Sequence, residues 1–461
     1  MAFLGDRAGV TLERGRMGEH GCDDRGHDRP HGNVAGVTGA RRIGVSYERT
    51  TTDRTTAAMY WRDRAVHLAP GGAQVTVMLP FDGERLARLA GDAGVDVVLA
   101  STRHNVRYLT GGYYLHFFAR ASRFGGGQYL SFVAVPAARP EGAFYVGRRD
   151  EILDEQHYID AFGPFWIGER HWVPRGPSMS QDAATVAARA LGAGGHGTAT
   201  IAIESSFLPA DAYDALRREL PAATFVNGTA LLGELRAIKQ PRELERLREV
   251  HRLTAEVIRQ VFAESGAADT TREISARIRR RIGERGAAFL YSLINVGPGL
   301  RRAPSSEAWD RGRAMHLDVG AELDEYVADI ARMGSVGAPP AEAAALFDIC
   351  VAAQARARAV VGPGVACGDV WRTGTDAVKS GRAAEYGRFL AHGLGMVSHE
   401  PPVVAQDSTR PLEPGMVLSI ETEVRHPDVG HIKLEDSVVV TERGCDGLGD
   451  VDREWCVVAP G

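Results

Sequence analysis

From about Val75 onwards, apolar positions at helical spacing alternate with short apolar runs that are typical of buried strands. Residues 84–93 are spaced as a helix, and residues 105–112 as a helical turn that leads into a glycine-rich loop. Strands are expected in four apolar runs, 95–100, 129–135, 142–146 and 201–204, the last followed by a helix through Leu216. Helices and strands that alternate in this way predict an α/β domain.

A second arrangement of elements follows the segment 227–239, which we interpret as the domain boundary. Pro241 opens a long helix that runs through Val261, because proline is well accommodated in the first helical turn. The remaining elements are expected to be helices at 273–284, 340–359 and 371–386, a strand at 289–296, and strands between Val417 and Val440. This order predicts an α+β domain with helices on one face of a mixed sheet.

The first 75 residues are rich in Arg, Gly, Asp, His and Thr and poor in branched apolar side chains. Such a segment can bury little apolar surface, so we expect it to be disordered, at least to about residue 55. The chain is therefore divided into an N-terminal extension (1–75), a smaller α/β domain (76–234) and a C-terminal α+β domain (235–461).

Composition narrows the function classes. The net charge of −5 provides no general attraction for nucleic acid or an anionic membrane. No run of about 18 apolar residues is present, and the first residues lack the apolar core of a secretory signal. Scattered cysteines without a CxxC pair favour free thiols in a reducing compartment. We expect a cytoplasmic enzyme with no nucleic-acid or membrane partner.

Candidate chemistry begins in the segment 317–332, LDVGAELDEYVADIAR, where Asp318 and Asp329 each lie in a short apolar run. The polar break between the runs predicts a hairpin, and a turn centred near Leu323 would place the two carboxylates opposite each other. Directly opposed Cβ atoms in a sheet are about 5 Å apart. Two carboxylates that close require either a proton on one of them or a cation between them.

A second hairpin is expected near the end of the chain, where MVLSIETEV and HIKLEDSVVV flank the turn RHPDVG. A turn centred near Asp428 would place Glu421 opposite Glu435. Both lie among apolar residues, where a carboxylate is rarely buried without a partner. His392 is followed by glycines at 393 and 395, which we interpret as room for the backbone to pass close to whatever His392 binds.

Four carboxylates and one imidazole make a suitable ligand set for two divalent cations. Oxygen-rich ligation with a single His suits Mn, Fe, Co or Zn. Two such cations, roughly 3.5–4 Å apart, can share a bridging hydroxide and clamp a carbonyl oxygen. The pattern therefore favours a hydrolase over the alternative that all four carboxylates are salt-bridged surface residues.

Four ordered motifs resemble those of the M24, or "pita-bread", metallopeptidases, which include Xaa-Pro aminopeptidase, prolidase, methionine aminopeptidase and creatinase. The motifs are D-x-G…Y-x-x-D-x-x-R from Asp318 to Arg332, HG-x-G-x-x-x-HE-x-P from His392 to Pro402, L-x-P-G-M-V-x-x-I-E from Leu412 to Glu421, and I-x-x-E-D-x-V-x-V-T-E from Ile432 to Glu442. Residues 96–111 and 235–243 resemble the family's N-terminal domain and its junction to the catalytic domain.

The resemblance implies a C-terminal pita-bread domain behind a creatinase-type domain, a homodimer, and a small peptide or small molecule as substrate. It also implies two divalent ions, Mn in the first place and otherwise Co, Zn or Fe. Their ligands would be Asp318, Asp329, His392, Glu421 and Glu435, with Asp329 and Glu435 bridging.

The same resemblance implies roles for the neighbouring side chains. Glu421 would be the acid/base group, and His399 would stabilise charge that develops on the substrate. Arg332 and Lys433 would orient the carboxylates.

The loop 297–309, GPGLRRAPSSEAW, departs from the family pattern, because it lacks the His that usually stands about 17 residues before the first ligand. Arg301, Arg302 or Ser305 lies near that place, and His316 alternates with Asp318 and is expected on its sheet face.

Three hypotheses follow from the motifs and this loop. The leading one is a dinuclear Xaa-Pro aminopeptidase or dipeptidase. The alternative is a creatinase-like or lyase-like enzyme of the same fold that cleaves a C–N or C–S bond in a small polar metabolite, with Arg301 and Arg302 holding a carboxylate. The third is a binding protein without catalytic activity.

Overall fold

The computed structural model describes residues 65–68, 75–112, 128–148, 165–174 and 179–459 of the 461-residue chain. All of these belong to one compact unit, 60–461. Most of the extension expected to be disordered lies outside the described residues. Strand β1 (Ala65–Leu68) is described, however, and pairs with β2 (Val75–Met78), so regular structure begins before Val75.

The N-terminal part holds a six-stranded mixed sheet with the order β6-β5-β4-β3-β7-β8. Its strands are β3 (Val97–Ala100), β4 (Phe132–Pro136), β5 (Phe144–Arg148), β6 (Glu169–Val173), β7 (Thr200–Ile203) and β8 (Thr224–Asn227). Its helices are α2 (Gly83–Ala93), α3 (Arg103–Thr110), α6 (Met179–Ala193), α7 (Ala210–Glu219) and α8 (Thr229–Ala237). Alternate residues of β3 pack in two different apolar clusters, one with α6 and α7 and one with α2 and α3. The predicted α/β arrangement is therefore present.

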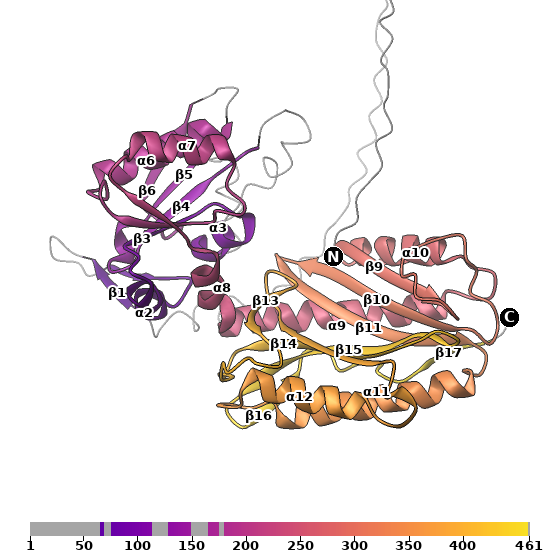
Figure 1. Ribbon diagram of the computed structural model, residues 1–461. Coiled ribbons are helices and arrows are strands. Elements are labelled where there is room, and N and C mark those ends of the chain that lie inside the picture. The colour runs from indigo at the N-terminus through magenta and orange to yellow at the C-terminus, as the bar shows by residue number, and fades with distance from the viewer. Residues whose placement is uncertain (1–64, 69–74, 113–127, 149–164, 175–178, 460–461) are drawn as a thin grey trace, which may run out of the picture. The chain divides into compact units, whose positions relative to one another are not determined.

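The C-terminal part is organised around a nine-stranded sheet, and its main path runs β13-β12-β14-β15-β11-β10-β9 (Figure 1). Its strands are β9 (Ala288–Val296), β10 (Ala314–Leu323), β11 (Tyr326–Val336), β12 (Gly387–Gly393), β13 (Glu400–Val403), β14 (Val417–His426), β15 (Gly430–Thr441), β16 (Gly444–Gly447) and β17 (Cys456–Val458). Neighbouring strands are antiparallel except β11 and β17, which makes the sheet mixed, as predicted.

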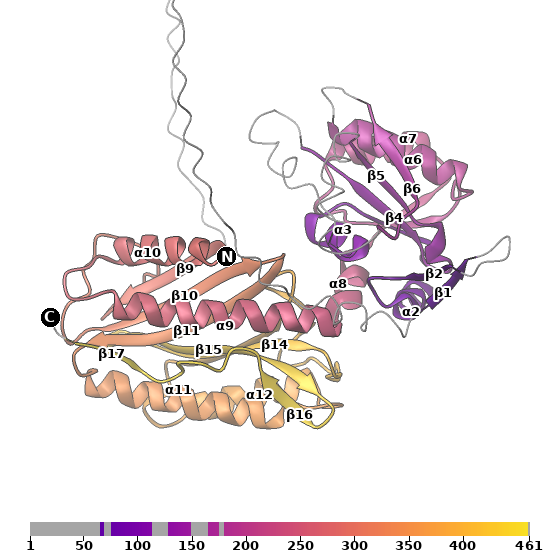
Figure 2. The ribbon, with the colours of Figure 1, turned by 180° about the vertical axis from the view of Figure 1, so that it is seen from behind.

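Four helices cover this sheet: α9 (Pro241–Ala263), α10 (Thr271–Glu284), α11 (Ala341–Val360) and α12 (Cys367–Val378). Figures 1 and 2 show α9 and α10 beside β9 to β11, and α11 and α12 beside β14 and β15. Helix α9 starts at Pro241 as expected, and a capping box of Gln240 and Glu243 satisfies its first backbone donors. The helix predicted at 371–386 is wrong beyond Val378, because the chain turns there through Gly381, which has φ +52°.

The helices pack on one face of the sheet, and polar residues occupy the other. Leu317 and Val319 of β10 pack in the cluster with α9 and α10, whereas Ile420 and Leu434 pack in the cluster with α11 and α12. Because successive side chains of a strand point to opposite faces, the intervening residues project from the face without helices. The metal ligands predicted on β10, β11, β14 and β15 are all among these intervening residues.

Arg332 joins the two halves of the sheet, since β11 and β15 share only one paired position, Ala331 with Glu435. The guanidinium is buried and donates to the backbone carbonyls of Glu435 and Val451, at 2.9 Å each, and to Asp436 Oδ1 at 2.7 Å. These bonds take the place of a regular ladder. Arg332 thereby positions the strand that carries Glu435.

We expect Arg332→Met to lower the free energy of unfolding by about 3 kcal/mol, since it removes the guanidinium donor from several buried carbonyls and leaves the buried Asp436 paired with Arg453 alone. Urea denaturation of the full chain measures the loss. Arg259→Met is the matched control, because Arg259 is largely exposed in its ion pair with Asp452 and its loss should cost less than about 1 kcal/mol. Equal losses in the two variants would refute the role given to Arg332.

Candidate metal centre

The first predicted hairpin is present, but its register differs from the expected one. Gly320 pairs with Asp329, and Asp318 pairs with Ala331. The turn consists of Asp324 and Glu325, with φ +50° and +73°, and so lies one residue later than assumed. A two-residue turn with both φ angles positive matches the twist of the flanking strands. Asp318 and Asp329 are therefore diagonal neighbours on one face rather than directly opposed.

The second hairpin has the predicted register. Glu421 pairs directly with Glu435, and the turn is centred at Asp428. The hydroxyl of Ser419 donates to Glu435 Oε1 at 2.8 Å, which orients this carboxylate. His392 lies on the neighbouring strand β12, opposite Ser419.

These strands bring the predicted ligands together on the face without helices. Asp329, His392 and Glu435 each offer a ligand atom within 4.8 Å of the others. His392 Nε2 is also 3.2 Å from Glu421 Oε1. Asp318 Oδ1 and Asp329 Oδ1 are buried without a hydrogen-bond partner among the described residues. Buried carboxylate oxygens without donors, next to an imidazole, are suitable ligands for a divalent metal ion.

Lys433 lies at the centre of the cluster. Its Nζ is 2.8 Å from Asp318 Oδ2, 2.7 Å from Glu421 Oε2 and 2.8 Å from Glu435 Oε2. The ammonium group is buried and links the two hairpins. Lys433 thus contacts three of the five predicted ligands directly, which is a closer role than its place in the sequence motif indicated.

His399 is exposed at the edge of the cluster and stacks on His392, with ring centroids 3.9 Å apart. The next residue, Glu400, is fully buried and ion-paired with Arg236 and Lys239, at 3.1 and 2.9 Å. The glycines after His392 make room for this segment, because a Cβ at 393 or at 395 would lie 2.2 Å from an oxygen of Glu400. We expected these glycines to leave room beside whatever His392 binds, and the nearest atoms that the structure shows for them belong to the segment at Glu400.

Tyr291 is a site residue that the motifs did not indicate. It lies on β9, and burial together with the nearby charge of Asp329 raises the pKa of Tyr291. Its ring crosses β10 at Gly320, where a Cβ would lie 2.3 Å from the ring. The glycine of the D-x-G motif therefore has a steric reason, and a search for an aromatic partner of that glycine could have found Tyr291.

The loop 297–309, which lacks the family's His, places Arg301, Arg302 and Ser305 in different surroundings. Arg302 Nη1 is 3.7 Å from Asp318 Oδ2, whereas Arg301 is exposed and takes part in none of the ion pairs found among the described residues. Ser305 contacts Thr271 of α10 and lies outside the cluster. His316 lies on the same face as Asp318, as predicted, with its Nε2 3.9 Å from Asp318 Oδ2.

Comparisons with known proteins agree with these motifs. The profile of metallopeptidase family M24 matches residues 245–442, and that of the creatinase/prolidase N-terminal domain matches residues 84–238. A Xaa-Pro dipeptidase from Pyrococcus horikoshii is 26% identical over 269 residues, covering 56% of this chain and 75% of the relative. The peptidase YqhT of Bacillus subtilis, described as uncharacterized, is 27% identical over 369 residues, covering 78% and 95%.

A comparison with solved structures shows that the fold is shared. The crystal structure of a dipeptidase from Pyrococcus horikoshii superimposes with a TM-score of 0.70 at 23% identity, covering 82% of this chain and 99% of that one. The chain belongs to metallopeptidase family M24. Members of this family are hydrolases that depend on divalent metal ions, and the pita-bread fold behind a creatinase-type domain is confirmed. No described helix of this metallopeptidase is long and apolar enough to span a membrane.

Burial and mutual repulsion make the cluster costly without a cation. Burial raises the pKa of Asp329 to about 7, and the charge of Asp318 acts in the same direction. Burial also raises the pKa of Glu435 well above its ordinary value, with Asp329 and Glu421 adding to the effect. Two carboxyl groups of this M24 site therefore retain protons near neutral pH unless positive charge is supplied.

The opposite end of the cluster is already charged. Burial opposes ionisation of Glu421, but Lys433 and His392 outweigh it, so the pKa of Glu421 lies below its ordinary value. Burial likewise opposes the charge on His392, and Glu421 outweighs it, which raises the pKa of His392. Burial and the nearby His392 lower the pKa of His399, which therefore carries a neutral imidazole at pH 7.

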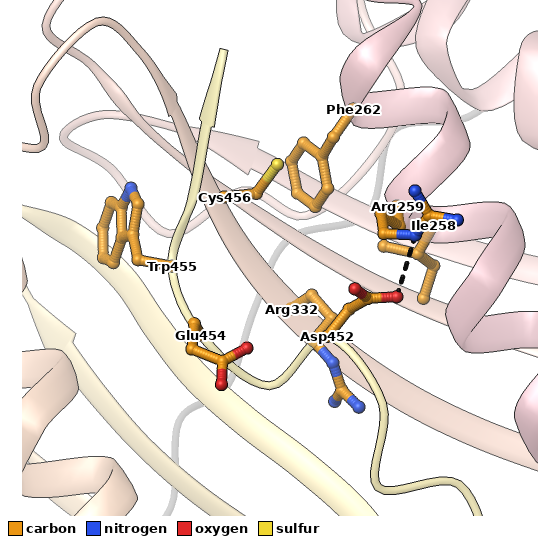
Figure 3. A pocket seen from close by; sticks show the side chains of 8 residues that line it. All are labelled: Ile258, Arg259, Phe262, Arg332, Asp452, Glu454, Trp455 and Cys456. Carbon is orange, nitrogen blue, oxygen red and sulfur yellow. Dashed lines mark ion pairs between the residues drawn. The ribbon is translucent and has the colours of Figure 1, made fainter.

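A separate pocket of the M24 domain lies between α9 and the C-terminal segment (Figure 3). It is lined by Ile258, Arg259, Phe262, Arg332, Asp452, Glu454, Trp455 and Cys456. None of the five predicted ligands is among them. Its relation to the cluster is indirect, through Arg332 and the backbone of Glu435.

Gly320→Ala should displace the Tyr291 ring and lower the free energy of unfolding by about 1–3 kcal/mol, the usual cost of overpacking. Gly283→Ala in α10 is the matched control, because a Cβ there meets no atom within 4 Å and the helix should gain up to about 1 kcal/mol. Urea denaturation of both variants measures the difference. A Gly320→Ala protein as stable as the Gly283→Ala protein would contradict the packing described for Tyr291.

Proposed function

We propose that this metallopeptidase hydrolyses the amide bond that precedes proline in small peptides, as a Xaa-Pro dipeptidase or aminopeptidase with two divalent ions. The observation that carries the proposal is the convergence of four carboxylates and His392 on one sheet face, with buried oxygens of Asp318 and Asp329 left without donors. The named activity of the Pyrococcus horikoshii relative, a Xaa-Pro dipeptidase, supports the substrate class.

The proposed ligands divide according to their places on the sheet. Asp329 and Glu435, which are adjacent at the junction of β11 and β15, would lie between the two ions. Asp318 would complete one ion's ligands, and His392 with Glu421 the other's, since these two lie together at 3.2 Å. The bound ions would supply the Lewis acidity that activates water and polarises the scissile carbonyl.

The side chains around the ligands have complementary tasks in this proposal. Glu421 is ionised at neutral pH and can accept a proton from the attacking water. His399 is exposed beside His392 and, as a neutral imidazole, can donate a hydrogen bond to the developing oxyanion. Lys433 orients Asp318 and Glu421, and Tyr291 lies beside Asp329.

The proposals for the metal, the assembly and the cellular location rest on the family resemblance and on composition. We propose Mn as the metal in the cell, a homodimer as the assembly, and the cytoplasm as the location. Oxygen-rich ligation with one imidazole is compatible with Mn, and also with Fe, Co or Zn.

Metal analysis tests the ligand set. Purified protein incubated with Mn²⁺ should retain two ions per chain by elemental analysis, and Asp329→Ala should retain fewer. Asp324→Asn, in the exposed turn of the same hairpin, is the matched control and should retain both. Unchanged metal content in Asp329→Ala would refute the assignment.

The affinity for Mn²⁺ should depend on pH because Asp329 must lose its proton to bind a cation. With a pKa of about 7 in the metal-free protein, this group is protonated below pH 7 and ionised above it. Apparent affinity should therefore rise by up to about tenfold per pH unit below 7 for each displaced proton, and less steeply above 7, where Asp329 is ionised and Glu435 still has a proton to lose. Isothermal titration calorimetry between pH 5.5 and pH 8.5 measures this. A flat profile would contradict the proposed role of Asp329.

Hydrolysis tests the reaction itself. The Mn²⁺-loaded protein should release proline from Ala-Pro and leave Ala-Ala largely intact. His399→Ala should lower kcat by roughly 10²- to 10³-fold, the usual loss for one oxyanion donor, with metal content unchanged. Chromatography of the products measures both. Failure of the metal-loaded protein to cleave any Xaa-Pro peptide would overturn the proposed function.

A further inference from the structure

The polar face of the sheet extends beyond the proposed ligands. Along each strand the next residue on the same face is again polar: His316 precedes Asp318 by two positions, His431 precedes Lys433, and Glu423 follows Glu421. All three added side chains are buried to 98% or more. Buried polar residues in consecutive rows are uncommon in a protein interior and require partners.

Within the group of His316, His431 and Glu423, some polar atoms lack a hydrogen-bond partner among the described residues. His431 and Glu423 form a 2.6 Å contact, and Arg425 is 2.7 Å from the same carboxylate. His316 stacks on His431, with centroids 4.3 Å apart. Both ring nitrogens of His316 lack a hydrogen-bond partner among the described residues. A fully buried imidazole with a donor and an acceptor left over is a sign of a missing ligand.

Arg302 reaches into this region from a braced loop. The carbonyl of Arg302 accepts a hydrogen bond from Ile294 N, and Asn295 Nδ2 donates to the carbonyls of Gly299 and Arg301. The guanidinium remains partly accessible, with the side chain 29% exposed. Its one ion pair among the described residues is the 3.7 Å approach to Asp318. Arg302 is therefore positioned by the backbone but holds no close acceptor.

The charges of the neighbouring side chains explain why Arg302 needs a negatively charged partner. Lys433 is shared by three carboxylates, and Arg425 is paired with Glu423. Once Asp318 ligates a divalent ion, as proposed above, its negative charge is neutralised and Arg302 loses its counterion. Burial lowers the pKa of His316 well below its usual range, and the neighbouring positive groups act in the same direction, so this ring is neutral and offers one N–H donor.

We propose that Arg302, with His316 behind it, forms a subsite for the free carboxylate of the substrate and makes the protein a dipeptidase. The inference rests on the proposed function and narrows it. In a Xaa-Pro dipeptide the carboxylate is attached to the Cα that directly follows the scissile nitrogen. One residue spans at most about 3.6 Å, so a guanidinium 3.7 Å from a ligand of the ions lies within reach of that carboxylate. In a longer peptide the same position holds an uncharged amide.

A planar guanidinium binds a carboxylate through two parallel hydrogen bonds, which an amide cannot accept. The free acid should therefore be preferred to its amide by roughly 10- to 100-fold, the range for one charge-assisted partner. The preference should act mainly through KM, because the carboxylate is bound in the ground state as well as in the transition state.

The test compares Ala-Pro, Ala-Pro-amide and Ala-Pro-Ala as substrates of the Mn²⁺-loaded protein. The wild type should cleave Ala-Pro with the highest kcat/KM. Arg302→Met should raise KM for Ala-Pro by about 10- to 100-fold and leave the amide little changed. Arg302→Lys should recover part of the loss, because lysine keeps the positive charge but cannot form the two parallel hydrogen bonds of a guanidinium. Arg301→Met is the matched control and should behave as the wild type.

A second readout does not depend on turnover. Isothermal titration calorimetry of the Mn²⁺-loaded wild type should detect L-proline binding more tightly than L-prolinamide, and Arg302→Met should remove that difference. Metal content of each variant, measured in parallel, shows that the ligand cluster is intact.

The outcomes separate this inference from the proposed function. Cleavage of neither acid nor amide overturns the proposed function and the subsite with it. Cleavage of acid, amide and tripeptide at equal rates, unaffected by Arg302→Met, leaves the peptidase and overturns the subsite alone. A faster reaction with Ala-Pro-Ala than with Ala-Pro would identify an aminopeptidase and contradict the dipeptidase assignment.

Discussion

The site is governed by one electrostatic constraint: four carboxylates are buried within a few ångströms of one another around a single ammonium group. Lys433 contacts three of them and cannot neutralise all four. Each buried and uncompensated charge costs several kcal/mol, so the raised pKa values of Asp329 and Glu435 express the deficit. Divalent ions are the compensation that we propose, and they explain why buried oxygens of Asp318 and Asp329 have no donors.

The scaffold keeps these groups in place at points remote from the chemistry. Arg332 substitutes for a ladder between β11 and β15 and so positions Glu435. Glu400, clamped by Arg236 and Lys239, anchors the segment that follows His399. Both anchors are buried charge pairs, which are strongly destabilising when only one partner is lost. The geometry of the site therefore depends on buried ion pairs whose residues are not themselves proposed metal ligands.

Much of the fold was predictable because strand and helix patterns are local. The second hairpin was predicted in its true register, since Pro427 and Gly430 mark a turn of defined length. The first hairpin was placed one residue off, because its turn residues, Asp324 and Glu325, carry no glycine or asparagine to locate the positive φ angles. The helix expected to continue to Tyr386 ends at Val378, where Gly381 lets the chain turn back toward β12.

The site was predictable to the extent that alternation along a strand decides which side chains share a face. This reasoning placed the four carboxylates and His316 on one sheet face, as the structure shows, whereas Tyr291, Lys433 at the centre and Arg302 beside Asp318 depend on contacts between distant segments. Such contacts follow from register and loop packing, which no local pattern encodes. The separation of Arg301 from Arg302 is the clearest case, because adjacent identical residues have different surroundings.

The most direct test of the account is a crystal structure of the protein soaked with Mn²⁺, with anomalous diffraction recorded at the manganese edge. The account predicts two anomalous peaks between the hairpins, with Asp329 and Glu435 contacting both and Asp318, His392 and Glu421 completing the ligands. Peaks only at other sites, with the carboxylates still closed around Lys433, would contradict it.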